Sequence, residues 1–143
     1  MSDEIESDID LYFTIQVKFT HSSMSAEAIS QALERRADRM WSVGDPRATP
    51  TGRVLGGSHK ETYWTYTEVV RGKRRFFAEI LKVIDTYSTH ENFLAGFRKT
   101  GGMTSIILGL SGKNNIGDLL NSDDIRRIFY SGFEIGVEVF PNL

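Results

Sequence analysis

An α+β fold is predicted by three stretches of this 143-residue sequence. In residues 11–19, large apolar side chains alternate strictly with more polar ones, which is the pattern of a strand with one buried face. In residues 73–88, apolar side chains recur every three or four positions and predict an amphipathic helix. Residues 133–140 alternate again and predict a closing strand. Because each apolar face needs a cover, we expect helices on one face of a mostly antiparallel sheet.

The elements between these stretches follow the same periodicities. Ser25 can cap a helix that begins at residue 26, because its hydroxyl accepts a hydrogen bond from an unpaired backbone N–H group. A continuous apolar run at 106–108 predicts a central strand. In chain order we expect strand 11–19, helix 26–36, strand 39–43, loop 44–60, strand 61–70, helix 73–88, helix 91–99, strand 103–111, loop 112–118, helix 122–132 and strand 133–140. This order contains the βαββαβ pattern of a ferredoxin-like core, with a helix and a strand added at the C-terminal end.

Length and composition predict one domain with an acidic tail. A chain of this size fits a single domain, so we expect an α+β domain over residues 10–141, preceded by an acidic, flexible N-terminus at residues 1–9. The first ten residues hold five carboxylates and no base, unlike a signal peptide, and the longest apolar run is too short to cross a bilayer. The chain has no cysteine, which excludes disulfides and thiolate-bound zinc. We expect a cytoplasmic protein without membrane contact.

The strongest candidate site is a basic segment flanked by tryptophans. Residues 35–75 contain ten bases and four acids, and the loop 44–60 holds four glycines and two of the three prolines. Long loops in compact domains often carry binding residues, and aromatic rings among bases can stack on nucleic acid while neutralising phosphate. Alternatively, the tryptophans are core residues, which we favour for Trp64 and leave open for Trp41. The candidate binding residues are Trp41, Asp45, Arg47, Arg53, His59, Lys60 and Trp64; Arg39 and Tyr66 belong to the same wider group.

No catalytic, nucleotide-binding or metal-binding motif stands out. Residues 109–115 follow a strand but lack the first glycine and the Ser or Thr of a P-loop. The three histidines are far apart in the sequence, and none has a second histidine at ligand spacing. Glu134 and Glu138 share a strand face but lie about 13 Å apart, too far for a glycosidase pair. We therefore predict no catalytic residue, metal or cofactor, and the sequence favours a non-enzymatic protein while leaving an unrecognised enzyme open.

Several ordered segments resemble a family of small bacterial proteins called domain of unknown function 4279. They are the first strand followed by SAEAISQAL, the segment MWSVGDPR and the strand segment YWTY, and the spacing of the C-terminal FEIGVEVF agrees. The resemblance covers residues 10–140. It implies an α+β domain in a bacterial cytoplasm and supplies no activity. The stretch between Asp45 and Lys60 is longer than the resemblance leads us to expect.

Three functions remain open at this point. The first is a non-enzymatic protein-interaction domain, either a toxin-neutralising (immunity-like) module or a regulatory one. It is favoured by the uneven charge and by the lack of a catalytic motif, with another protein preferred over nucleic acid as the partner. The second is a binder of a small anionic ligand or nucleic acid at the 44–60 loop. The third is an enzyme. The sequence does not indicate an oligomeric state.

Overall fold

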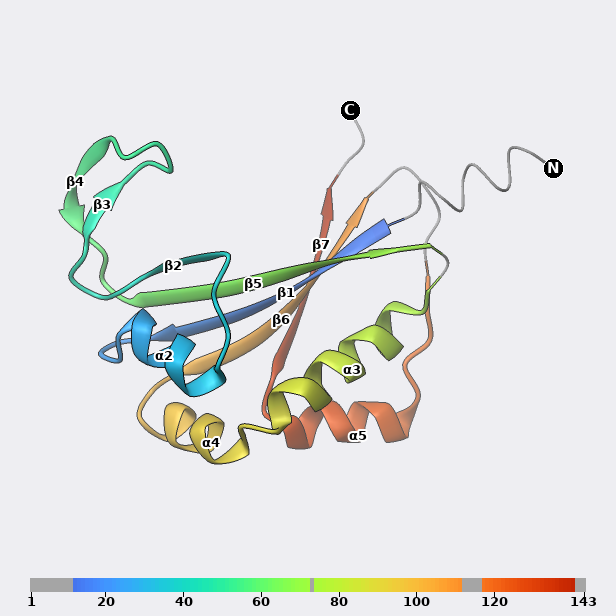
Figure 1. Ribbon diagram of the computed structural model, residues 1–143. Helices are drawn as coiled ribbons and strands as arrows, with labels where there is room; N and C mark the ends of the chain where they lie inside the picture. The colour runs from blue at the N-terminus through green and yellow to red at the C-terminus, as the bar shows by residue number, and fades with distance from the viewer. Residues whose placement is uncertain (1–11, 73, 112–116, 141–143) are drawn as a thin grey trace. The chain divides into compact units, whose positions relative to one another are not determined.

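The computed structural model describes residues 12–72, 74–111 and 117–140, which form seven strands and four helices (Figure 1). The acidic N-terminus at 1–9, Leu11 and most of the loop at 112–118 lie outside the described residues. In chain order the elements are β1 (Tyr12–His21), α2 (Ala26–Leu33), β2 (Arg39–Trp41), β3 (Pro46–Ala48), β4 (Val54–Ser58), β5 (Thr62–Arg71), α3 (Phe76–Ser88), α4 (Glu91–Lys99), β6 (Met103–Ser111), α5 (Ser122–Ser131) and β7 (Glu134–Phe140).

Five of the strands form one sheet in the order β2-β5-β1-β6-β7. β2 pairs with β5 in antiparallel orientation, and β6 pairs with β7 in parallel orientation. β3 and β4 form a separate two-stranded sheet. The prediction of a mixed α+β fold built on a mostly antiparallel sheet is therefore confirmed. Over the ranges that the structure describes, no helix is long and apolar enough to span a membrane.

β1 buries the apolar face that its alternation predicts. Phe13, Ile15 and Val17 are at most 4% exposed, whereas the residues between them are half-buried. The ring of Phe13 meets that of Phe76 edge-on at 6.0 Å. Because Phe76 opens α3, this contact places the predicted helix against the predicted face, and both predictions are confirmed.

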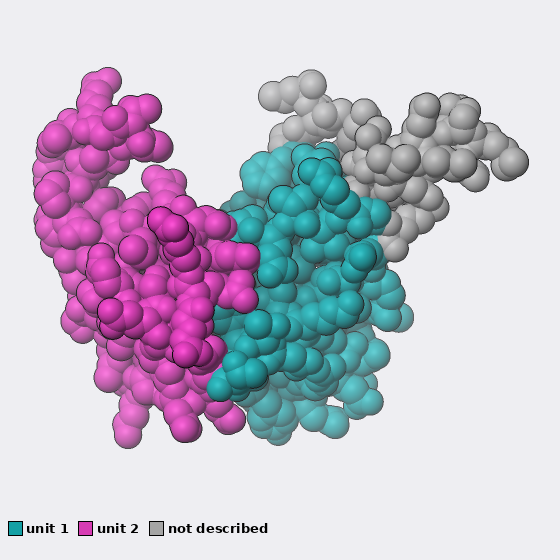
Figure 2. Space-filling model, in the orientation of Figure 1, with its two compact units in different colours: residues 1–17, 67–89, 105–143 teal, residues 18–66, 90–104 magenta. Residues whose placement is uncertain are grey.

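The chain divides into two compact units, drawn in different colours in Figure 2. Unit 1 comprises residues 1–17, 67–89 and 105–143, and unit 2 comprises residues 18–66 and 90–104. Unit 1 contains α3 and α5, and the rings of Tyr87 and Phe133 lie 6.3 Å apart within it. Unit 2 is centred on Phe19, whose ring meets Trp64 at 5.4 Å and Phe97 at 5.5 Å. The boundary falls within β1, β5 and β6, and a single domain over 10–141 stays a prediction.

Three elements are shorter than the sequence predicts by two residues or more, and one of them is the helix expected over 73–88, which begins at Phe76. The helix expected over 26–36 ends at Leu33, because Glu34 adopts a left-handed conformation with φ of 52°. Its N-terminus matches the prediction, since the Ser25 hydroxyl accepts a hydrogen bond from the Ala28 N–H group. The strand expected over 39–43 ends at Trp41. A tight turn follows, because the carboxylate of Asp45 accepts a hydrogen bond from the Ser42 N–H group.

The segment 44–60 is not the irregular loop that its composition predicts, and that prediction was wrong. β3 and β4 pair in antiparallel orientation, with Pro46 opposite Ser58 and Ala48 opposite Val54, and the register shifts between these pairs. The Thr49 N–H group donates to the Arg53 carbonyl at the end of the hairpin. We call residues 46–58 the hairpin. Its glycine and proline content is unusual for strands, which explains why composition indicated a loop.

Candidate functional site

The hairpin is exposed along both of its strands. Every residue of β3 and β4 is accessible to solvent, including Val54 at 73% and Leu55 at 49%. Arg47 on β3 and Arg53 just before β4 are exposed as well. Figure 2 shows the hairpin standing out from the rest of unit 2. An isolated two-stranded hairpin is only marginally stable in water, so its attachment to the unit matters.

Backbone hydrogen bonds and a carboxylate fix the point of attachment. The Gly44 N–H group donates to the His59 carbonyl, and the His59 N–H group donates to the Asp45 carbonyl, both at 2.9 Å. The Asp45 carboxylate lies 2.9 Å from the Ser42 backbone nitrogen, which donates to it. Gly44 has a φ of +87°, a conformation that side chains disfavour. Asp45 therefore holds the turn at the foot of the hairpin, and its carboxylate is already engaged.

Three aromatic rings stack beside this turn. The indole of Trp41 lies 4.2 Å from the His59 ring and 4.3 Å from the Tyr63 ring, with interplanar angles of 15° and 13°. Two coplanar rings cannot both fit that close on one face of an indole, so His59 and Tyr63 cover opposite faces. The Trp41 indole N–H group also donates to the Glu61 carbonyl at 3.2 Å. The stack ties the end of the hairpin to β2 and β5.

The stack changes what Trp41 can do. Sequence reasoning treated its ring as a platform for a nucleic-acid base, which needs a free face. In the structure both faces are covered, and the Arg39 guanidinium lies 5.1 Å from the indole as well. Trp41 is thus a half-buried support for the hairpin and offers no free ring face to a base.

Trp64 does not join the site. It is fully buried, its indole N–H group donates to the Ser30 hydroxyl at 2.9 Å, and its ring packs edge-on against Phe19. Its inclusion among the binding candidates was wrong, and the alternative interpretation as a core residue is confirmed. Tyr66 lies elsewhere, with the Arg35 guanidinium 4.5 Å from its ring.

The structure brings together the remaining candidates and adds three residues. Arg47 and Arg53 lie on the exposed hairpin, whereas Lys60 is exposed just beyond its foot. Sequence reasoning missed Tyr63, Val54 and Leu55. The register places Tyr63 directly opposite Trp41, which no spacing in the sequence reveals. Val54 and Leu55 could have been found from the sequence, because they are the two large aliphatic residues of the otherwise polar segment 44–60.

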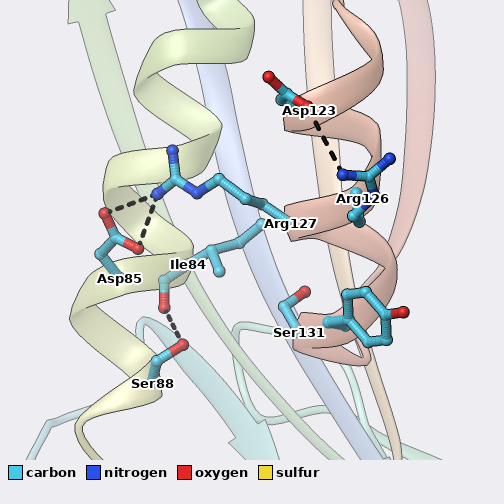
Figure 3. Close-up of a pocket in the computed structure, with 8 residues that line it drawn as sticks. Ile84, Asp85, Ser88, Asp123, Arg126, Arg127 and Ser131 are labelled. Atoms are coloured by element: carbon cyan, nitrogen blue, oxygen red, sulfur yellow. Dashed lines mark hydrogen bonds and ion pairs between the residues drawn. The ribbon is translucent and has the colours of Figure 1, made fainter.

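A concavity lies between α3 and α5 in unit 1 (Figure 3). It is an open groove of about 500 Å³. The Arg127 guanidinium lies 3.1 Å from both carboxylate oxygens of Asp85, and Arg126 lies 3.7 Å from Asp123. Because these four charges neutralise one another in pairs, the groove offers no charged ligand an unmatched partner.

Comparison with known proteins adds no further assignment. No protein-family model matches the chain, and no curated protein or solved structure is significantly similar to it. The resemblance to domain of unknown function 4279 stays a prediction. Among the described residues, no group of three histidine or carboxylate side chains is placed to hold a metal ion.

Proposed function

We propose that this chain is a non-enzymatic protein-interaction domain whose docking element is the hairpin. The observation that carries this proposal is the exposure of both strands, β3 and β4, along their whole length. Val54 and Leu55 are exposed to solvent on the hairpin, and the aromatic stack supports the hairpin at its foot. A partner that covers these two side chains removes apolar surface from water, which favours association.

The charges around the hairpin favour an acidic partner surface. Residues 46–60 contain Arg47, Arg53 and Lys60 and no acidic residue. Asp45 and Glu61 flank this segment, and the Asp45 carboxylate accepts a hydrogen bond from a backbone N–H group. Complementary charge of this kind speeds association and selects partners more than it adds affinity. We therefore expect the partner to present carboxylates around a small apolar patch.

A toxin-neutralising, immunity-like module or a regulatory module fits this mode of binding. Such a domain acts by covering the functional surface of another protein, so it needs no catalytic group of its own. An acidic, exposed partner surface and a basic, exposed hairpin supply the required complementarity.

We also propose that the scaffold has a ferredoxin-like core with helices on one face. The strand order β2-β5-β1-β6 supports this, because it is the order that a βαββαβ chain adopts when each helix crosses one intervening strand. β7 and the helix before it are then the additions at the C-terminal end. In this arrangement the hairpin is an insertion between the second and third strands of the core.

The second candidate is a small anionic ligand or a nucleic acid at the hairpin. The arginines favour it, since they can neutralise phosphate. The covered faces of Trp41 argue against base stacking there. We prefer the protein partner because an exposed apolar pair at the hairpin contributes little to an anion site.

The test is the double variant Arg47→Ala/Arg53→Ala. Both side chains are exposed, so thermal stability should change little. The wild-type chain should capture an acidic protein from its native cells, and the double variant should lose it. The purified partner should bind the wild type less tightly as salt is added, because salt screens exposed charges.

The matched control is Arg74→Ala/Lys82→Ala in unit 1, which removes two exposed cations that pair with Glu79. It should retain the partner at wild-type affinity. Mobility-shift assays with single-stranded DNA and RNA distinguish the second candidate. If the hairpin variant and the control bind the purified partner equally well, the hairpin is not the docking element.

A further inference from the structure

β7 leaves one edge of the main sheet open. It pairs with β6 on one side, and among the described residues no strand pairs with its other side. Natural edge strands are usually protected by charges, proline or bulges. β7 carries two exposed glutamates, Glu134 and Glu138, but it also exposes Val137 at 56%, Val139 at 61% and Phe140 at 57%. An edge of this composition favours pairing with another strand.

The exposed valines of β7 continue a buried face. In the parallel register Val137 lies beside Leu108, and Val139 lies beside Leu110. Paired residues of neighbouring strands point to the same side of a sheet. Leu108 is only 1% exposed, so Val137 lies on the core side of the sheet. Val137 is nevertheless exposed, because no described residue covers it there.

One flank of α5 is apolar and exposed in the same unit. Arg127 pairs with Asp85 of α3, so that side of α5 faces α3. Ile128 is buried, whereas Ile125 is 53% and Phe129 is 75% exposed. At about 100° per residue, Ile125 and Phe129 lie on the flank turned away from α3. α5 therefore has an apolar flank that is exposed to solvent, as the edge of β7 is.

We propose that two copies of this chain form a homodimer by antiparallel pairing of their β7 strands about a two-fold axis at Val137. This register sets Val137 opposite its own copy and Ile135 opposite Val139. Each glutamate then faces an uncharged residue, with Glu138 opposite Gly136 and Glu134 opposite Phe140. Apolar pairs in direct opposition stabilise antiparallel strands.

Charge excludes the neighbouring symmetric registers. An axis at Gly136 sets Glu134 opposite Glu138, and an axis at Glu138 sets that residue opposite its own copy. Like charges in direct opposition destabilise a strand pair. Of the symmetric registers that pair at least five residues of β7, the one centred on Val137 is therefore the one that keeps the glutamates apart.

The flank of α5 supports the same partner. A two-fold axis perpendicular to the plane of the paired β7 strands leaves the α5 helices of both copies on the same face of these strands. The two α5 helices then lie on either side of the axis, with their Ile125 and Phe129 flanks turned toward each other. The dimer buries the apolar flank and the open edge together, and an isologous interface of this kind is typical of homodimers.

The first test is the molar mass of the full chain, measured by sedimentation equilibrium at several concentrations. The wild type should be a dimer. Val137→Lys places two ammonium groups in opposition at the axis and should raise the dimer dissociation constant by about tenfold or more. The control is Val69→Lys on β5, a valine of 53% exposure, which should remain dimeric. A monomeric wild type, or a Val137→Lys variant with the wild-type dissociation constant, overturns the proposal.

The second test determines the register by disulfide crosslinking. The chain has no cysteine of its own, so an introduced cysteine is its one thiol. Val137→Cys puts two thiols in direct opposition, close enough to form a disulfide. Glu134→Cys puts its two thiols about 20 Å apart in this register. Under mild oxidation, only Val137→Cys should give a covalent dimer. Efficient crosslinking of Glu134→Cys, or none of Val137→Cys, shows that β7 does not pair in this way.

Discussion

Asp118 serves as a distant N-terminal cap for α3. Its carboxylate accepts hydrogen bonds from the Phe77 N–H group at 3.1 Å, from the Leu119 N–H group at 2.8 Å and from the Arg75 guanidinium at 2.9 Å. Arg75 occupies the cap position itself but makes no side-chain cap bond. A residue far along the sequence thus supplies what the local sequence lacks, and α3 depends on it.

Replacing Asp118 with asparagine should lower the free energy of unfolding by about 1–2 kcal/mol at neutral pH, the usual cost of losing a charged cap. Burial raises the pKa of this carboxyl, but the hydrogen bonds from Arg75, Phe77 and Leu119 outweigh it, so the folded-state pKa lies below the ordinary value. The unfolded chain therefore binds the proton more readily. The stabilisation is present above about pH 4 and disappears as the pH falls through the folded-state pKa.

Urea titrations of both proteins over a pH series measure this effect. The difference between wild type and Asp118→Asn should shrink as the solution becomes strongly acidic. Asp85→Asn is the matched control, because Asp85 is 66% exposed and its pair with Arg127 should contribute little. Equal losses in the two variants would mean that the Asp118 contacts do not stabilise α3.

At the scale of the elements, α3 contributes a stripe of buried apolar side chains to the core of unit 1. Ile80 is fully buried and Ile84 is 4% exposed. Truncating Ile84 to alanine should cost about 2–5 kcal/mol of unfolding free energy, the range for a buried isoleucine. Thr86→Ala on the exposed side of the same helix is the control and should cost much less. A loss below about 1 kcal/mol for Ile84→Ala in a urea titration would contradict this assignment of the core.

Elements with a clear period were predictable, whereas the hairpin was not. The alternation of β1 and the three- and four-residue spacing of α3 each identify a buried face without further information. Residues 46–58 have neither period, and Gly56 and Gly57 interrupt β4. Their strands are specified by the turn at Gly44 and by the backbone bonds of His59, which composition does not report.

The candidate site was predictable only in part, for a related reason. Basic residues in a long segment mark an exposed region, so Arg47 and Arg53 were found. The stack of Trp41 depends on the pairing register of β2 with β5 and on the return of the hairpin. Trp64 shows the limit of alternation in β5, where Thr65 next to it is also buried. Local pattern there does not say which side faces the core.

For the whole molecule, the structure predicts a gradient of protection against hydrogen exchange. Amides of β3 and β4 bond only across an exposed pair of strands, so local opening should release them early. Amides of β1 and β6, which are interior strands of the sheet, should exchange slowest. Exchange followed by mass spectrometry on the isolated chain measures this order. Hairpin amides as protected as those of β1 would mean that another surface covers the hairpin.

The placement of the two tryptophans means that their fluorescence follows the unfolding of one unit only. Both Trp41 and Trp64 belong to unit 2, and unit 1 has none. Trp64 is fully buried, so its emission shifts to longer wavelength when unit 2 unfolds, while helical ellipticity follows the helices of both units. Comparing the two melting curves distinguishes one cooperative transition from two. Trp41, stacked on His59 at the foot of the hairpin, is a second emitter whose fluorescence should change if a partner docks there.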